Sequence, residues 1–297
     1  ALDATRLLPA VDPENREALI SLGAFLENVV TISPQYGRQA EVEIIAKTNR
    51  EEEVALVTFV QSNDEEGKAL ARQQEELIKT RHTLRKPYKK EELDAGDLSA
   101  LQAIFPASGI QCFYFPLRSA EGTYLADAIV AAMAKQGLPM KNKGIRKLHP
   151  LFQKEAEKWQ DGITPEMMGL TGIKKWFVSA FYDQNTVMSA SFRKQTVQST
   201  KEQATNCAGF FLICSPDGTV ESLINTGQLL QRFWLAATAR KIAVHPMSSV
   251  LEESPWREEL GAKLGINGKV QMVLRVGYVN DYGTRISQRR PVPVSGN

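Results

Sequence analysis

The hydrophobic and polar positions of the first 60 residues follow a helical period and then a strand-like one. Asp12 and Pro13 have the residue types of an N-cap and a first helical residue, and the pattern ends before Pro34. Between them, apolar side chains recur at helical spacing at Leu19, Leu22, Phe25, Leu26, Val29 and Val30. Residues 42–46 and 54–60 are rich in β-forming side chains, and the polar stretch between them is typical of a hairpin connection.

The middle of the chain alternates between the two patterns and then becomes irregular. The patterns predict helices over 64–79, 98–104, 124–135 and 145–159, and a strand over 110–115. Residues 161–204 are predicted to form a long irregular excursion, because glycine and proline interrupt any regular period there. The interrupting residues are Gly162, Pro165, Gly169 and Gly172. Such excursions are often lids over a substrate, although plain surface insertions are at least as common.

The last third gives the clearest pattern. Residues 208–214 form a continuous apolar run that predicts a buried strand, and the helix predicted over 223–239 is apolar around much of its circumference. A short link containing Pro246, a helix over 256–264 and a strand over 270–279 follow. Strands separated by long helices indicate an α/β or α+β domain.

The composition excludes several classes of function. The 297-residue chain has a formal net charge of +2, so it lacks the broad positive field that captures nucleic acid or anionic membranes. No apolar run approaches the roughly 20 residues needed to span a bilayer. We therefore expect no transmembrane segment and no nucleic-acid partner. Any phosphate must be bound by a local cluster of arginines.

The cysteines and histidines are few and dispersed. Three cysteines cannot complete a disulfide framework, and three scattered histidines lack metal-ligand spacing, so we expect free thiols and no metal site. The sequence begins at Ala1, which leaves two interpretations open. The chain is either trimmed and cytoplasmic, or a mature periplasmic protein whose export signal was removed.

A basic segment at the start of the middle third carries the first candidate chemistry. Arg81, Thr83 and Arg85 alternate, so an extended backbone would place two guanidinium groups and a hydroxyl on one side. A guanidinium fork matches the oxygen atoms of a phosphate, and the hydroxyl adds a neutral donor. His82 lies within the same segment. On charge alone, a solvated basic loop is the better interpretation.

Two further segments are candidates for ligand contacts. Pro246, Met247, Ser248 and Ser249 follow the long apolar helix, and small residues after a proline let backbone N–H groups approach a ligand. An ordinary helix-to-helix loop is about as good an interpretation. Beyond the last strand, a run at residues 287–291 contains two arginines at a position where α/β proteins often bind ligands. A frayed basic tail is the alternative. The two arginines are Arg289 and Arg290.

The order of these segments resembles the nitroreductase family of FMN proteins. In that family an Arg-x-Ser/Thr-x-Arg/Lys segment precedes a long helix, a short proline-containing loop, a strand ending in Gly-Tyr or Gly-Phe, and an Arg-Pro tail. The matching residues are Arg81, Thr83 and Arg85; 228–239; Pro246 to Ser249; Gly277 and Tyr278; and Arg290 and Pro291. The resemblance covers the chain from about residue 81 onward. It implies an α+β sandwich with a central, mostly antiparallel sheet flanked by helices.

The mid-chain pattern Arg-x-Thr-x-Arg-x-Pro-Tyr resembles one branch of the family, in which two lobes are fused as an internal pseudo-dimer. This implies a reduced N-terminal lobe over 1–79 and a main FMN-binding lobe over 80–297. In ordinary members a partner subunit supplies a Pro-Ser-x-x-Asn-x-Gln-Pro-Trp loop to the flavin. Its nearest counterpart here is the segment 33–39, which lacks most of that motif. The chain would be a monomeric pseudo-dimer or a homodimer, with its N-terminal lobe covering one side of the flavin.

The resemblance also implies roles for the candidate residues around the flavin phosphate. Arg81, Arg85 and either Arg289 or Arg290 would neutralise the phosphate, and Thr83 would add a hydroxyl donor.

Around the flavin ring, His82 would lie beside the isoalloxazine, and the backbone of residues 247–249 would face its edge near N5. The implied function is an FMN-dependent oxidoreductase, with no side chain required as a general base. It would transfer electrons from NADH or NADPH to a small electron-poor acceptor such as a quinone or nitro compound. The alternative is an FMN-binding or flavin-storage protein with little turnover.

Overall fold

The computed structural model describes residues 1–9, 12–106, 109–136 and 189–285 of the chain. Its helices are η1 (Ala4–Arg6), α1 (Arg16–Ile32), η2 (Ser33–Tyr36), α2 (Glu65–Thr80), α3 (Ala95–Gln102), α4 (Ala120–Gln136), α9 (Ala190–Ala204), α10 (Val220–Ala239), α11 (Ser249–Glu252) and α12 (Trp256–Lys263). Its strands are β1 (Arg38–Ile44), β2 (Ala55–Gln61), β3 (Gln111–Pro116), β4 (Gly209–Ser215), β5 (Ala243–Pro246) and β6 (Lys269–Gly277). The helix predicted over 145–159 lies outside the described residues.

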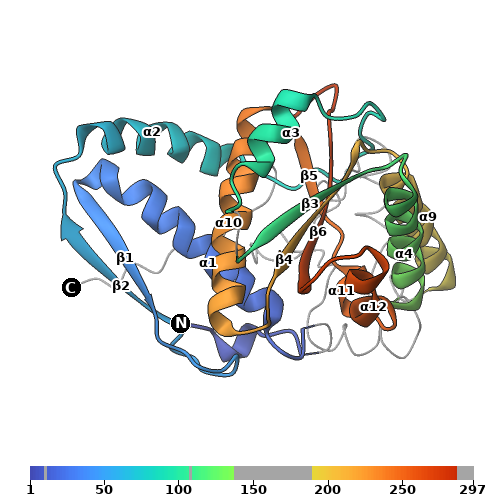
Figure 1. The fold of residues 1–297 in the computed structure, drawn as a ribbon, viewed down its shortest axis with the longest axis horizontal. Coiled ribbons are helices and arrows are strands. Elements are labelled where there is room, and N and C mark those ends of the chain that lie inside the picture. The colour runs from blue at the N-terminus through green and yellow to red at the C-terminus, as the bar shows by residue number, and fades with distance from the viewer. Residues whose placement is uncertain (10–11, 107–108, 137–188, 286–297) are drawn as a thin grey trace.

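A four-stranded antiparallel sheet in the order β3-β4-β6-β5 is the centre of the fold. Helix α10 crosses one face, and α4, α9, α11 and α12 lie on the other side (Figure 1). Each residue of β4 is buried because both faces of the strand are covered. Phe211 and Ile213 contribute to the core beneath α10, whereas Phe210 and Leu212 contribute to the core beneath α4. The predicted α+β architecture with an antiparallel sheet is confirmed.

The first helix begins later than its sequence pattern predicted. Asn15 precedes it in the left-handed conformation with φ 53°, and the helix starts at Arg16 instead of Pro13. Asp12 still accepts a hydrogen bond from a backbone amide of the first turn, because its Oδ2 lies 3.0 Å from the Ala18 nitrogen. The side chain therefore satisfies a helix donor from a position outside the helix.

Two further elements correct the sequence prediction. The end of the predicted irregular excursion is helix α9, whose N-cap Ser189 accepts from the Phe192 amide at 3.2 Å. The glycines and prolines that motivated the prediction all precede this helix. The link before Pro246 contains strand β5, which pairs with β6. Four residues are too few to show a strand period.

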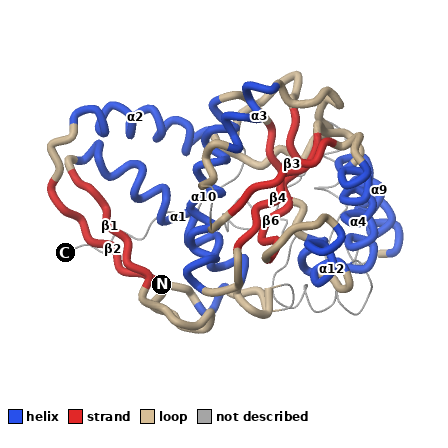
Figure 2. Tube along the Cα trace, viewed as in Figure 1, coloured by secondary structure: helices blue, strands red, loops and turns tan. Residues whose placement is uncertain are grey.

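The N-terminal unit repeats part of the main unit. Apart from the short helices η2, α11 and α12, the order helix, strand, strand occurs as α1–β1–β2 and again as α10–β5–β6, and both strand pairs are antiparallel. Figure 2 shows β1 and β2 as a strand pair separate from the main sheet. A shift of 204 positions (227 − 23) superimposes the motif Leu-Ile-x-x-Gly of one helix on that of the other. The same shift relates Asn15 to Thr219, the N-caps of the two helices.

The two repeated helices contact each other reciprocally. A Cβ added to Gly23 would lie 2.1 Å from the Ile224 carbonyl oxygen, and one added to Gly227 would lie 2.0 Å from that of Ile20. The helices therefore cross with their backbones in close approach at paired glycines. Residues related by the shift exchange places across this contact, as in an isologous interface between identical subunits.

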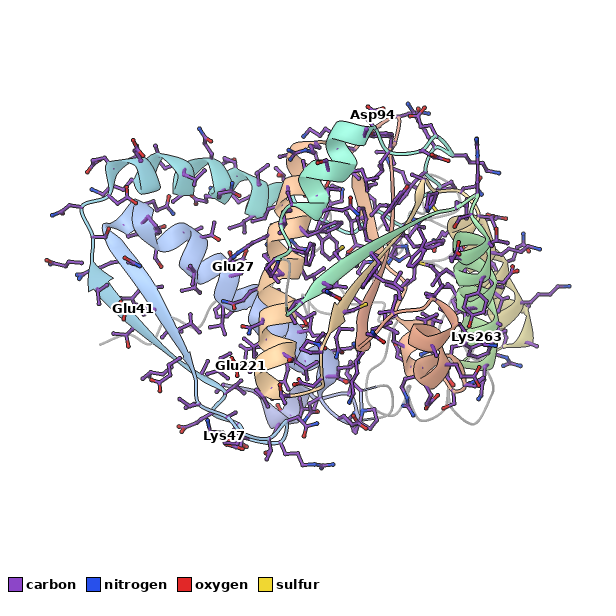
Figure 3. The ribbon with its side chains drawn as sticks, in the orientation of Figure 1. Glu27, Glu41, Lys47, Asp94, Glu221 and Lys263 are labelled. Atoms are coloured by element: carbon purple, nitrogen blue, oxygen red, sulfur yellow. The ribbon has the colours of Figure 1, made fainter. Side chains whose placement is uncertain are left out.

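The side chains one helical turn beyond the glycines also contact each other reciprocally. The Glu27 carboxylate accepts from Arg232 Nε at 2.6 Å and Nη2 at 3.0 Å, and Gln231 Nε2 donates to Asn28 Oδ1 at 2.7 Å. Residues 27 and 231 are equivalent under the shift, as are 28 and 232. Figure 3 labels Glu27 between the two helices.

In the described part of the chain, no helix is long and apolar enough to cross a membrane.

Candidate functional site

The segment from Arg81 to Tyr88 leaves α2 and lies against the sheet. The Leu84 amide donates to the Val244 carbonyl of β5 at 3.3 Å, and the Tyr88 amide donates to the Asn206 carbonyl at 3.0 Å. The first bond places the basic segment beside the strand that leads into Pro246. Two candidate segments that are far apart in the sequence are therefore neighbours in space.

A buried arginine that the sequence analysis missed holds this segment. Arg275 of β6 is 0% exposed, and its guanidinium lies 3.8 Å from the centre of the Tyr88 ring. It donates to the carbonyl groups of Gln203 at 2.8 Å, Leu84 at 3.2 Å and Lys86 at 3.1 Å. Among the described residues no carboxylate forms an ion pair with it, so its charge is balanced only by carbonyl dipoles and an aromatic face.

His245 lies directly opposite Arg275 in the sheet. Burial, reinforced by the positive charges of Arg275 and Arg85, holds the pKa of His245 well below its usual value, so the imidazole is neutral. Its Nδ1 is buried and has no hydrogen-bond partner among the described residues. Burial also lowers the pKa of Arg85, but an arginine stays charged at neutral pH. The local environment is thus positive and holds an unsatisfied ring nitrogen.

The first arginine of the segment stacks on the long helix. The guanidinium of Arg81 lies 4.5 Å from the centre of the Trp234 ring of α10. Stacking occupies the face of a guanidinium, whereas phosphate oxygens bind along its N–H edge. Trp234 therefore orients Arg81 without competing for the same surface of the group.

His82 occupies a different environment from the one expected beside a ligand. Its Nδ1 is 2.7 Å from the Thr80 carbonyl oxygen and its Nε2 is 3.2 Å from that of Tyr282, with the Tyr282 ring packed edge-on. The side chain is buried, and backbone groups flank both ring nitrogens. His82 thus ties the end of α2 to the chain that follows β6.

The proline loop is anchored to the sheet as well. The Met247 amide donates to the Val273 carbonyl at 2.8 Å, and Met247 and Ser249 are buried. Ser248 is half-buried, and its carbonyl accepts from the Leu251 amide at 2.7 Å. Arg289 and Arg290 lie outside the described residues. Of the predicted ligand segments, the structure brings together the basic segment and the proline loop.

A family match covers the residues that form this arrangement. Residues 78–278 match the family model described as "Nitroreductase family", which is more than half of the chain. The chain belongs to the nitroreductase family. The nitroreductase match begins three residues before Arg81 and ends at Tyr278, so it contains the basic segment, Arg275 and the proline loop.

Solved nitroreductase structures show a distant likeness. An FMN-dependent nitroreductase NfnB from Mycobacterium smegmatis in complex with NADPH is 20% identical, with a TM-score of 0.44 over 74% of this chain and 96% of that one. A nitroreductase with bound FMN from Bacteroides fragilis is 13% identical, with a TM-score of 0.40 over 75% and 97%. An FMN- and NADPH-dependent nitroreductase NfnB from sphigopyxis sp. strain HMH is 13% identical, with a TM-score of 0.44 over 75% of this chain and 95% of that one. No curated protein sequence matches the chain.

The nitroreductase match excludes the N-terminal unit. The segment 33–39, expected to stand in for the partner loop of ordinary nitroreductases, precedes the matched residues. It forms η2, a left-handed Gly37 with φ 66°, and the start of β1. The sequence pattern concealed Arg275, because an arginine in an apolar strand looks like an outward-facing position. Its signal in the sequence was a single charge within the strand predicted over 270–279.

Proposed function

We propose that the chain binds FMN between the basic segment and the proline loop. The observation that carries the proposal is a buried positive charge: Arg275 is fully buried, and in the described part of the chain no carboxylate pairs with it and Nδ1 of the adjacent His245 has no hydrogen-bond partner. A dianionic phosphate supplies the missing negative charge. The residues present therefore fit the cofactor, and they lie within the part of the chain that matches the nitroreductase family.

The basic segment would hold the phosphate. Arg81, oriented by Trp234, and Arg85 would bind phosphate oxygens, with Thr83 as a neutral donor and Arg289 or Arg290 as a further cation. These positions support the proposal because Leu84 and Tyr88 fix the backbone between and after the arginines.

The proline loop would face the ring. The backbone of Met247 to Ser249 would lie along the edge near N5, where donors stabilise negative charge. We propose that His82 orders the segment around Tyr282 instead of touching the ring, because its two nitrogens already face carbonyl groups. When bound, FMN would supply the redox chemistry between NADH or NADPH and an electron-poor acceptor.

We further propose that residues 1–79 are a reduced lobe that takes the place of a second protomer. The reciprocal contacts of Gly23 with Gly227 and of Glu27 with Arg232 support this, because they have the symmetry of a homodimer interface. The chain would then carry one site. The shift of 204 positions puts Glu41 at the place of His245, and an acid there repels a phosphate.

We propose a second candidate for the counterpart of the partner loop, beside 33–39. The sequence Pro106-Ala107-Ser108-Gly109-Ile110-Gln111 follows α3, the first helix after the basic segment, and ends where β3 begins. It lies inside the matched residues, whereas 33–39 does not. It contains a proline, a serine and a glutamine, but their spacing differs from that of the family motif and the asparagine is absent.

Binding of FMN and of riboflavin by variants tests the proposal. A charge-assisted contact contributes about 1.5–3 kcal/mol, so Arg81→Ala and Arg85→Ala are each expected to weaken FMN binding by roughly 10- to 100-fold. Riboflavin lacks the phosphate, and its binding is expected to change little. Lys90→Ala removes a positive charge outside the segment and serves as the control. Equal weakening of both ligands would show that the arginines do not bind phosphate.

Turnover is measured on the same preparation. Consumption of NADPH with a quinone or nitroaromatic acceptor is expected if the protein is an oxidoreductase. Tight FMN binding without NADPH consumption would instead support the storage alternative.

A further inference from the structure

The exposed apolar side chains of the described residues gather in the N-terminal unit. The large hydrophobic residues that are exposed there are Leu8, Phe25, Tyr36, Ile45, Leu56, Phe59, Val60 and Leu70. The main unit contributes none to this set. Three of them lie on one strand: Leu56, Phe59 and Val60 of β2, at 54%, 53% and 36% exposure. Such a concentration on one strand is typical of an interaction surface.

The internal repeat shows what the equivalent strand of the main unit does. β2 corresponds to β6. The shift of 204 positions makes Glu41 equivalent to His245, and Glu41 pairs with Thr58 just as His245 pairs with Arg275. β6 has a partner on each edge, β5 on one and β4 on the other. Among the described residues, β2 pairs with β1 alone. Within the described residues, the edge of β2 that corresponds to the β4-covered edge of β6 therefore has no strand partner. Figure 1 shows β1 and β2 apart from the main sheet.

The side chains of β2 also lack the helical cover that buries both faces of the main sheet. Leu56 and Phe59 correspond to Val273 and Val276 of β6, which are 1% and 0% exposed. The backbone N–H and C=O groups along an open edge are also available to another strand. In the main unit the occupant of this edge is β4, seven residues without a charged side chain, Gly209–Ser215.

β2 resembles β4 in its length and in its lack of charged side chains. It is also seven residues long and carries no charged side chain, from Ala55 to Gln61. Two antiparallel copies would bring no like charges together, whereas pairing through β1 would bring Glu41 and Glu43 close to their counterparts. β2 also lacks the lysine or proline that commonly protects an open edge.

We propose that the β2 edge binds the β2 edge of a second copy of this chain. The two ribbons would form one antiparallel four-stranded sheet around a two-fold axis. This contact is separate from the α1–α10 crossing, which is already filled within one chain. It also needs no flavin, so its test does not depend on the proposed function.

Cross-linking gives a matched pair of variants. Thr58 is the midpoint of β2, so full antiparallel overlap places it opposite Thr58 of the second copy. Thr58→Cys is expected to form a disulfide-linked dimer on mild oxidation, because directly opposed Cβ atoms lie within disulfide reach. Glu41→Cys lies beside it on β1 and is the control, expected to remain monomeric on a denaturing gel. Equal cross-linking by both variants, or by neither, would overturn the proposal.

Mass measurement in solution tests the same contact without cysteine. The full chain is expected to form a dimer that dissociates on dilution, and Val60→Lys is expected to be monomeric because it places two like charges at the pairing edge. Glu43→Lys adds a lysine to the outer strand and is expected to leave the dimer intact. A full chain that is monomeric at its highest soluble concentration, or a dimer unchanged by Val60→Lys, would refute the β2 contact.

Discussion

Residues 15–61 and 219–277 form the same helix–strand–strand unit in two different surroundings. In the main unit, α10 packs on a sheet and β6 is a central strand. In the N-terminal unit, α1 buries residues only along the side that includes Leu19, Gly23 and Leu26, and β2 is an open edge. The equivalent positions of α10 are also buried, and α10 buries further residues against its own sheet. The helix contact is thus the part that both copies retain.

The two copies differ most where a ligand would bind. His245 and Arg275 of the main unit face each other at a buried, positive site. Their equivalents, Glu41 and Thr58, lie on an exposed ribbon, where Figure 3 labels Glu41. A carboxylate and a neutral hydroxyl at these positions cannot provide the positive charge that binds a phosphate. The same helix–strand–strand order therefore carries the proposed site in the main unit and a solvated surface in the N-terminal unit.

The paired glycines should show the largest effect, because they hold the two copies together. Gly23→Ala and Gly227→Ala are each expected to lower the free energy of unfolding by about 2–3 kcal/mol, since the new Cβ would meet a backbone oxygen. Gly96→Ala in α3 is the control, because a Cβ there meets nothing within 4 Å. It is expected to stabilise the helix by roughly 0.5–1 kcal/mol. Chemical denaturation checks all three variants, and equal losses would contradict the crossing.

The sequence predicted the elements with long periods and missed those defined by distant contacts. The apolar run of β4 and the broad apolar surface of α10 gave clear signals because both elements are covered on more than one side. β5 was missed because four residues depend on pairing with β6 for their conformation. The family resemblance implied two fused lobes, but the sequence did not show which residues correspond, since the evidence is reciprocal contact and only a short Leu-Ile-x-x-Gly motif is shared.

For the candidate site, the sequence selected segments whose contact with a ligand stays a prediction, and it missed the buried residues that hold them. Arg81, Arg85 and Pro246 could be selected because their residue types suit a phosphate and a tight approach. Arg275 could not, because its function depends on carbonyl groups contributed by residues far away in the chain. The environment of His82 was likewise invisible, since one of its two partners is Tyr282, 200 positions away.

Arg275 and Thr58 give the next comparison. Arg275→Lys keeps the charge but replaces a fork with a single nitrogen that cannot reach three carbonyl groups. It is expected to cost about 2 kcal/mol of stability and to weaken FMN binding at least roughly tenfold, because the Arg81–Tyr88 segment loses its anchor. Thr58→Ser on the exposed ribbon is expected to change neither. Thermal unfolding and flavin titration are the measurements, and unchanged FMN affinity in Arg275→Lys would contradict the anchoring role.

The smallest effect compares Glu17 with Glu221, which the shift of 204 positions makes equivalent. Burial, reinforced by the charges of Glu252 and Asp12, raises the pKa of Glu17 to about 7, while Arg16 opposes the shift. Glu221 is exposed at the start of α10, as Figure 3 shows. The two acids therefore occupy the same place in the repeat with different surroundings.

The sign of the pH dependence follows from the raised pKa. In the unfolded chain Glu17 loses its proton near its ordinary pKa, so the folded state binds more protons from there up to about pH 7. Its contribution to stability is thus fully present at low pH and is lost as the pH rises through that window. Glu17→Gln is expected to remove this loss. The stability of the variant relative to the unmodified chain should therefore be about 1–2 kcal/mol greater at pH 8 than at pH 4, allowing for the partial exposure of the side chain. Glu221→Gln is expected to leave the pH profile of unfolding unchanged. Identical profiles for the two variants would show that the N-terminal copy imposes no special environment on Glu17.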